Sequence, residues 1–295
     1  MKPALHIPRI GKTLLAAALV AMAGTAAAGK AIEGDIDAAK ALTFLYGNLQ
    51  TTKAGGEKPF GMPVGKEWAL WKNPQCDDLS NTDCPKEAKV HSAFGTKYTE
   101  QDKEKYFLLT RTADENPIFG AAIFAKEGGQ WVLEMENRYI GNSPDMLPPR
   151  EKYLSPDAED AHGMGFLCFL RFATESSLVR IGPDRHGVLI SAHGLAGSGN
   201  TDCLVMVMPY QEGVRSFVLD TVDYWDSEQV GSGKWSASFD EKSAGEYYDV
   251  VVRYQAQPRR SKAKRAEVRK FHFRDGNYYE VAAPKAGKKG AKKRK

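Results

Sequence analysis

The sequence predicts a mainly β protein made of antiparallel sheets, sandwich-like or barrel-like, with one or two short helices. Three observations support this fold class. Short segments rich in β-branched and aromatic residues recur along the chain, glycine-rich connections separate them, and strands do not alternate with long helices as in a parallel doubly wound sheet. With 295 residues, of which 42% are hydrophobic, the chain is long enough for a buried core and too apolar for a disordered protein.

The first residues have the pattern of a secretory signal peptide. Three basic residues and no acid precede an apolar run at 13–23, and small residues end it at Ala26, Ala27 and Ala28. The run is shorter than the roughly 20 apolar residues that span a bilayer, which argues against a membrane anchor. We therefore expect residues 1–28 to be removed and the mature chain to be soluble, in the periplasm or secreted.

Two segments carry the signals of short helices. Asp35 is a suitable cap for a helix over residues 36–47, in which apolar side chains recur on one face. Residues 155–160 combine a serine cap, a proline in the first turn and several acids, which is typical of a helix start.

The remaining elements read as strands. Gly128 and Gly129 predict a two-residue hairpin turn, and Asp275, Gly276 and Asn277 predict another. The predicted strands are residues 106–112, 118–126, 130–138, 165–173, 187–193, 203–209, 216–222, 234–239, 247–255, 268–274 and 278–281. We expect one mainly β region over residues 29–283, with a possible subdivision at the Pro- and Gly-rich residues 141–149, and a disordered basic tail over residues 284–295.

All four cysteines lie after the predicted signal peptide. An even number of cysteines in an oxidising compartment predicts disulfides, for which three pairings exist. Cys76 and Cys84 bracket a short polar loop and are expected to pair, which by elimination pairs Cys168 with Cys203. A zinc site formed by the last two cysteines with His162 and His193 is the alternative, but neither C-x-x-C nor H-x-x-x-H spacing occurs. We expect no metal and no cofactor.

Two groupings of polar residues could in principle carry hydrolytic chemistry. Glu134 and Glu136 lie two apart on a predicted strand, about 7 Å from each other, which suits the acid and base of an inverting glycosidase. Their simpler interpretation is the wet face of a half-buried strand. His193 and Ser198 lie in a glycine-rich stretch, but the chain has no G-x-S-x-G elbow. A periplasmic hydrolase is therefore an alternative function, and the sequence favours a protein that is not an enzyme.

The segment Ser232, Gly233, Lys234, Trp235 and Ser236 suggests another alternative. It resembles the S-G-x-aromatic-S loop that small periplasmic lysozyme inhibitors insert into the active-site cleft of their target. The resemblance implies inhibition of a wall-degrading enzyme, with Ser232, Lys234 and Trp235 in the inhibitory loop. Its simpler interpretation is a glycine-containing turn before a strand.

The distribution of charge is the most informative feature. The net charge of +4 divides into +3 for residues 1–28, −11 for residues 29–258 and +12 for residues 259–295. A basic hairpin loop and the basic tail, which lacks any apolar anchor, supply most of the last value. The expected polyanion-binding residues are Arg259, Arg260, Lys262, Lys264 and Arg265 in the loop and Lys288, Lys289, Lys292, Lys293, Arg294 and Lys295 in the tail.

These observations predict a binding protein of a bacterial-type cell envelope. Clusters of Lys and Arg bind polyanions in a salt-dependent manner, and outside the cytoplasm the available polyanions are anionic envelope polymers and lipids. Dedicated nucleic-acid recognition is not expected, because no DNA- or RNA-binding motif occurs. The competing interpretation is a tail that only increases solubility or folds back onto the acidic body.

Overall fold

The computed structural model describes residues 31–51, 64–72, 87–113, 117–140, 173–196, 199–225, 230–258 and 265–281. The chain divides into two units, Met1–Lys30 and Ala31–Lys295, and every described residue belongs to the second. The predicted signal peptide, the predicted helix at 155–160, the boundary at 141–149 and the basic tail lie outside the described residues.

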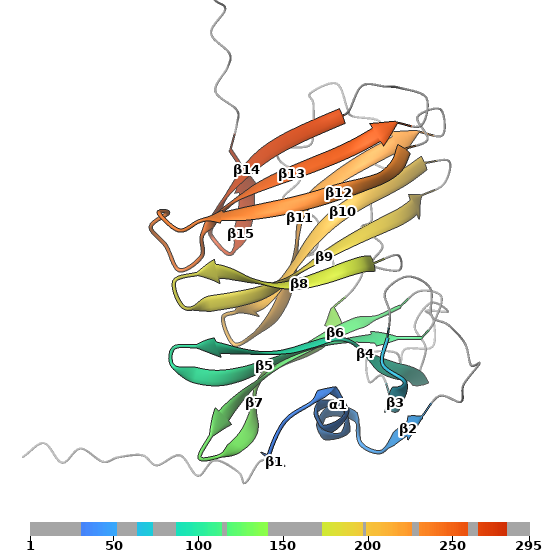
Figure 1. The fold of residues 1–295 in the computed structure, drawn as a ribbon, viewed down its shortest axis with the longest axis vertical. Coiled ribbons are helices and arrows are strands. Elements are labelled where there is room, and N and C mark those ends of the chain that lie inside the picture. Colours follow the sequence, from blue (N-terminus) through green and yellow to red (C-terminus); the bar gives the residue numbers. More distant parts are fainter. Residues whose placement is uncertain are drawn as a thin grey trace, which may run out of the picture. The chain divides into compact units, whose positions relative to one another are not determined.

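The mainly β, antiparallel prediction is confirmed, and the described residues include a single helix (Figure 1). The elements in chain order are β1 (Ile32–Glu33), α1 (Ala38–Tyr46), β2 (Leu49–Thr51), β3 (Glu67–Lys72), β4 (Glu87–Glu100), β5 (Lys103–Thr112), β6 (Phe119–Glu127), β7 (Gln130–Ile140), β8 (Ala173–Gly182), β9 (Arg185–Ala196), β10 (Gly199–Tyr210), β11 (Gly213–Trp225), β12 (Val230–Asp240), β13 (Asp249–Pro258), β14 (Arg265–Arg274) and β15 (Asn277–Glu280).

The helix begins later than the sequence predicts. Asp37, not Asp35, caps α1, because its side chain accepts a hydrogen bond from the backbone N–H of Lys40 at 2.8 Å. The Asp35 carboxylate instead accepts from the backbone N–H of Ile36 and pairs with Lys97 of β4. The helix ends at Gly47, whose φ of 94° lies in the left-handed region that glycine adopts without strain.

Strands β1 to β7 form the first sheet, sheet A, in the order β1-β7-β6-β5-β4-β3-β2. Gly128 and Gly129 have φ values of 57° and 85° and close the β6–β7 hairpin as a two-residue turn, as predicted. Helix α1 covers one face of this sheet, where Leu42 and Leu45 pack with Trp71 and Trp131. Apolar burial on this face holds the only described helix in place.

Strands β8 to β11 form sheet B, in the order β11-β10-β9-β8. Its two faces are both buried. Val188, Val205 and Val207 pack against Phe107 and Phe119 of sheet A, and the alternate residues of the same strands pack against sheet C. Burial on both faces explains why β10 reads as a continuous apolar run and not as an alternating one.

Strands β12 to β15 form sheet C, in the order β12-β13-β14-β15. One face carries Val250, Val252 and Phe271, which are buried against Met206 and Leu219 of sheet B. Sheet C also binds the Asp202 and Asp220 carboxylates of sheet B. Sheet C therefore has one packed face, and its other face carries the alternate residues.

Five strands were missed by the sequence prediction: β1, β2, β3, β4 and β8. Strand β4 contains Lys, Glu, Thr and Gly in place of an apolar run, and β8 begins with Ala, Thr, Glu and two Ser. In both cases pairing with apolar neighbours, β5 and β9, supplies the order that local propensity does not. The predicted strand at 165–173 reaches the described residues only at Ala173.

Substitution Gly182→Ala is expected to lower the free energy of unfolding by about 2 kcal/mol. A Cβ atom at Gly182 would lie 2.2 Å from the backbone oxygen of Glu246, and backbone cannot rotate away. The neighbouring Ile181 carbonyl accepts from the Tyr248 N–H at 2.6 Å, so the two segments cannot separate cheaply. Urea unfolding measures the change. Gly213→Ala is the control, since a Cβ there meets no atom within 4 Å, and an equal loss in both variants would contradict the interpretation.

Candidate functional site

The carboxylates of Glu134 and Glu136 do not form a side-by-side pair. In the β6–β7 register Ile123 opposes Met135 and Phe124 opposes Leu133, so Glu134 is the extra residue of a β-bulge. The bulge reverses the alternation: Leu133 packs on the α1 face of sheet A, whereas Met135 packs on the face toward sheet B. We expected Glu134 and Glu136 on one face of β7 and Leu133 and Met135 on the other. That expectation is wrong.

Each of the two acids is bound by its own cation. Glu134 binds Lys105 at 2.9 Å, on the face toward sheet B. Glu136 binds Arg138 at 2.9 Å, and the Arg138 guanidinium lies over the Tyr46 ring of α1. Two carboxylates on different faces cannot act on the same glycosidic bond. Glu134 and Glu136 are therefore not arranged as the acid and base of a glycosidase.

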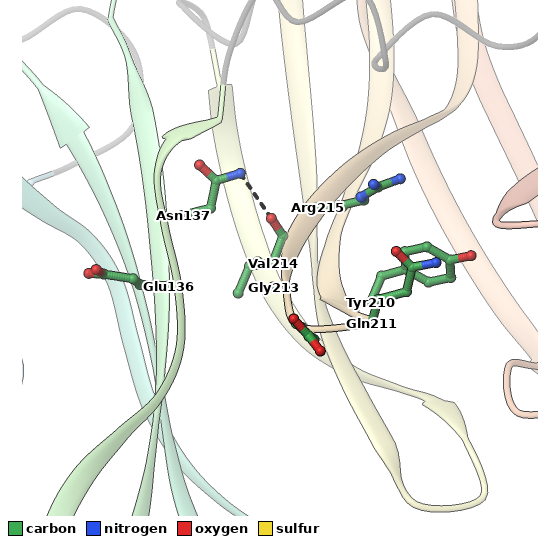
Figure 2. Close-up of a pocket in the computed structure, with 8 residues that line it drawn as sticks. Glu136, Asn137, Tyr210, Gln211, Gly213, Val214 and Arg215 are labelled. Atoms are coloured by element: carbon green, nitrogen blue, oxygen red, sulfur yellow. Dashed lines mark hydrogen bonds between the residues drawn. The ribbon is translucent and has the colours of Figure 1, made fainter. Parts of the chain in front are cut away.

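A pocket of about 320 Å³ lies where β7 meets the β10–β11 hairpin (Figure 2). Asn137 donates from Nδ2 to the Val214 carbonyl at 2.9 Å, which joins the two strands. The Glu136 side chain points away from Asn137, and Arg215 lies over the ring of Tyr210. The Asn137–Val214 hydrogen bond and the Arg215–Tyr210 contact hold the hairpin against its neighbours. We therefore interpret the pocket as part of the packing between these strands.

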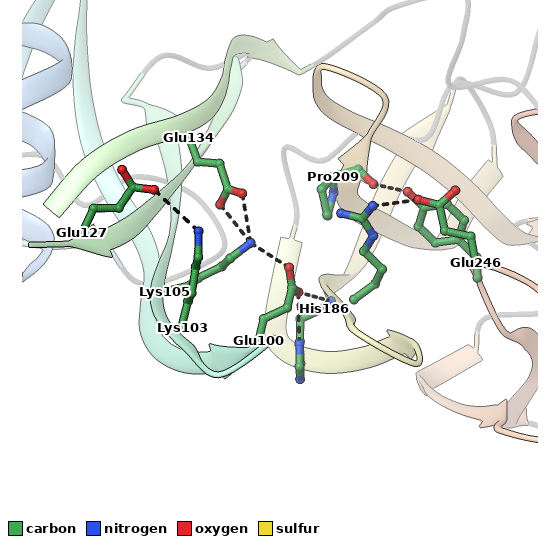
Figure 3. Close-up of polar contacts among 10 residues, drawn as sticks. Glu100, Lys103, Lys105, Glu127, Glu134, His186, Pro209 and Glu246 are labelled. Carbon is green, nitrogen blue, oxygen red and sulfur yellow. Dashed lines mark hydrogen bonds and ion pairs between the residues drawn. The ribbon is translucent and has the colours of Figure 1, made fainter. Parts of the chain in front are cut away.

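A buried ion-pair network links sheets A and B (Figure 3). The Glu100 side chain is only 2% exposed and accepts from Lys105 Nζ at 2.8 Å and from the backbone N–H of His186 at 3.0 Å. The Lys105 side chain is 7% exposed and also binds Glu134. The ring of Tyr98 packs on that of His186, with 5.0 Å between the ring centroids. No sequence signal indicated this cluster, because Glu100 and His186 are 86 residues apart.

The partners in this network determine its protonation. Burial alone would raise the pKa of Glu100, but hydrogen bonds from His186 and Lys105 outweigh burial and lower the pKa. Burial acts in the opposite direction on Lys105, and its bonds to Glu100 and Glu134 raise the pKa of the ammonium group. Both groups therefore stay charged at neutral pH. The network therefore joins sheets A and B through charged partners.

An aspartate and a histidine meet on the exposed face of sheet C. The Nδ1 atom of His272 lies 2.5 Å from Asp249 Oδ2, and Lys270 Nζ lies 3.6 Å from the same oxygen. The next residue across the sheet from His272 is Tyr279 of β15. The Asp249 carboxylate fixes the orientation of the imidazole, and the His272 side chain is 48% exposed.

The proposed inhibitory segment lies within a strand. Gly231 opposes Gln257 and Lys234 opposes Gln255, so Ser232 and Gly233 form a bulge in β12. Trp235 follows in the strand, with its ring 4.5 Å from that of Tyr254 on the packed face of sheet C. The glycine-containing turn expected here is a bulge, and Trp235 faces sheet B.

The basic loop is attached at one end of sheet C, and the last described strand runs toward that end. Strands β13 and β14 pair as a hairpin, and the basic loop connects Pro258 to Arg265. Strand β15 runs antiparallel to β14, and the backbone N–H of Val281 donates to the Lys270 carbonyl at 2.7 Å. At Val281 the chain therefore runs toward the end of the sheet at which β14 begins. Arg259, Arg260, Lys262, Lys264 and all the tail cations lie outside the described residues, and Arg265 is described only as a strand residue.

Other predicted site residues fall in different places. Cys203 is fully buried in sheet B, on the face toward sheet A. His193 is a residue of β9 that pairs with Asp202 in the ladder. Cys76, Cys84, Cys168, His162 and Ser198 lie outside the described residues.

Within the described part of the chain, no group of three or more His, Cys, Asp and Glu side chains is placed to hold a metal ion. The same residues include no helix long and apolar enough to cross a bilayer. Comparison of the chain with known protein families, with curated proteins and with solved structures found no match.

Proposed function

We propose that this chain is an exported binding protein of a cell envelope, which adsorbs to anionic surfaces through the basic end of sheet C. The observation that carries the proposal is the direction of the strands. The β13–β14 connection and the exit of the chain at Val281 bring two basic segments of the sequence toward the same end of one sheet. Residues 259–295 of the sequence carry a net charge of +12 that the total of +4 conceals.

Export is part of the proposal. It rests on the basic, apolar and small-residue regions of residues 1–28, and it places the cysteines in an oxidising compartment. The proposed Cys168–Cys203 disulfide would then join the buried Cys203 of sheet B to a segment that precedes β8. Such a crosslink stabilises a fold mainly by constraining the unfolded chain.

Removal of residues 284–295 is expected to weaken adsorption to vesicles that contain anionic phospholipid. Each Lys or Arg near such a surface contributes about 1 kcal/mol, and salt screens the attraction within a Debye length of about 10 Å at 0.1 M. Vesicle co-sedimentation of the full and the truncated chain, between about 0.05 and 0.5 M salt, measures the loss.

Zwitterionic vesicles serve as the control, because they lack the net negative charge, and neither chain should adsorb to them. A second variant with Arg259, Arg260, Lys262, Lys264 and Arg265 changed to Gln separates the loop from the tail. Adsorption that is unchanged in both variants, or that is insensitive to salt, would contradict the proposed function.

A further inference from the structure

The exposed face of sheet C is ordered into rows by the strand register. On the packed face, Trp235, Tyr254 and Val252 point toward sheet B, so the alternate residues point outward. Starting from the end that carries the basic loop, the outward rows are Lys234, Gln255 and Ala266, then Ser236, Arg253 and Val268, then Ser238, Val251 and Lys270, and finally Asp240, Asp249, His272 and Tyr279.

One cation occupies each of the first three rows. Lys234 lies on β12, Arg253 on β13 and Lys270 on β14, each one strand over and two residues along from the last. Diagonal neighbours in an antiparallel sheet are about 7–8 Å apart, so the three charges follow a diagonal line across the face. We call Lys234, Arg253 and Lys270 the cation diagonal.

Apart from Gln255, which opposes Lys234, the uncharged side chains beside the cation diagonal are short. Ser236, Ser238 and Ala266 reach little beyond the backbone, and Val268 is 64% exposed. The Arg253 guanidinium donates to Ser238 Oγ at 3.2 Å, which holds it over the sheet and away from an acid. Among the described residues of this face, the cations therefore stand above neighbours that are mostly shorter than they are.

The nearby acids lie at the other end of the face. Asp249 and Asp240 lie 3.6 and 3.9 Å from Lys270 Nζ, and Asp249 is also bound to His272. The first two rows carry Lys234 and Arg253 and no acid. Positive charge thus increases along the face toward the end where the basic loop is attached.

We infer that the exposed face of sheet C docks on the anionic headgroup layer of a phospholipid bilayer, with the cation diagonal against the phosphates. This inference rests on the proposed function, and it identifies which described residues would contact the anionic surface. A bilayer presents phosphates across a broad layer, and the register places the three cations of the diagonal on one face of the sheet. Proteins that bind a single polyanionic strand use instead a groove with aromatic side chains on which bases stack, and Tyr279 is the only aromatic residue in these four rows.

The triple variant Lys234→Gln, Arg253→Gln and Lys270→Gln tests the inference in the full chain. At about fivefold per cation, its partition onto phosphatidylglycerol vesicles should fall about 100-fold at low salt. The matched control changes Lys66, Lys72 and Lys103 of sheet A and its flank to Gln, which alters the net charge equally and should lower partition less than threefold. Circular dichroism and the thermal midpoint verify that both variants fold.

The outcomes separate this inference from the proposed function. A large loss in the diagonal variant and a small one in the control support the docking face. If the diagonal variant and the control bind equally while the chain without residues 284–295 loses binding, the face is not the docking surface and the proposed function stands. If the natural chain binds soluble heparin or polyphosphate but not the vesicles, the bilayer is the wrong partner. If it binds neither, both proposals fail.

Discussion

The Glu100→Gln variant is expected to unfold with a free energy about 3 kcal/mol lower than that of the natural chain at neutral pH. The substitution keeps the size of the side chain and removes its charge. Lys105, whose side chain is 7% exposed, would then lose its buried carboxylate partner and keep only the half-exposed Glu134. The backbone N–H of His186 would bind a weaker acceptor, which loosens the contact between sheets A and B.

The pH dependence of this loss has a defined sign. The pKa of Glu100 in the folded chain is lowered from its ordinary value of 4.5. Its contribution to stability is therefore present above that value and is lost as the pH falls through the lower, folded pKa. The difference in unfolding free energy between the natural chain and Glu100→Gln should be constant at neutral pH and shrink below about pH 4.

Urea unfolding at several pH values measures this difference, and Glu104→Gln is the matched control. Glu104 lies next to Lys105 on β5, but its side chain is 56% exposed and pairs with Lys126 at the surface. Exposed pairs contribute less than about 1 kcal/mol. Equal losses in the two variants, or a difference that grows at acid pH, would contradict the assigned role of Glu100.

The parts of the fold that depend on local signals were predictable. Gly128 and Gly129 indicated the β6–β7 hairpin because both positions require positive φ, and the apolar run of β10 indicated a buried strand. Strand β4 escaped prediction because polar residues and Gly95 interrupt its Val, Phe, Thr and Tyr residues, and its order comes from pairing with β5. Local sequence does not encode the partner that orders such a strand.

The candidate sites also divide into features that local sequence reveals and features that depend on how strands pair. Counting charges along the chain finds the excess of basic residues over 259–295, because charge is a property of each residue and needs no neighbours. That these residues bind a polyanion stays a prediction. The pairing of Glu134 and Glu136 was wrong, because a bulge shifts every later residue of β7 to the other face, and no residue of that strand signals the bulge. The cation diagonal could not be predicted, since it depends on the relative register of three strands.

Arg269 illustrates how far a charge count can mislead, because this residue of the basic end points inward. Its guanidinium binds the Asp220 carboxylate of sheet B, which is 1% exposed, and binds Glu267 at 2.8 Å. A buried carboxylate that loses the cation bound to it is costly. We expect Arg269→Met to lower the free energy of unfolding by about 3 kcal/mol.

Arg274→Met is the control for that variant, because the Arg274 guanidinium lies on the exposed face over the Tyr279 ring, and its loss should cost less than about 1 kcal/mol. The unfolding free energy and the vesicle partition of Arg269→Met together separate a structural role of Arg269 from a role in binding. Below its unfolding temperature, Arg269→Met should partition onto phosphatidylglycerol vesicles within about twofold of the natural chain, because its cation does not face the bilayer. A stable Arg269→Met variant with a large loss of partition would show that the packed face of sheet C also contacts the anion, and the docking face would have to be redrawn.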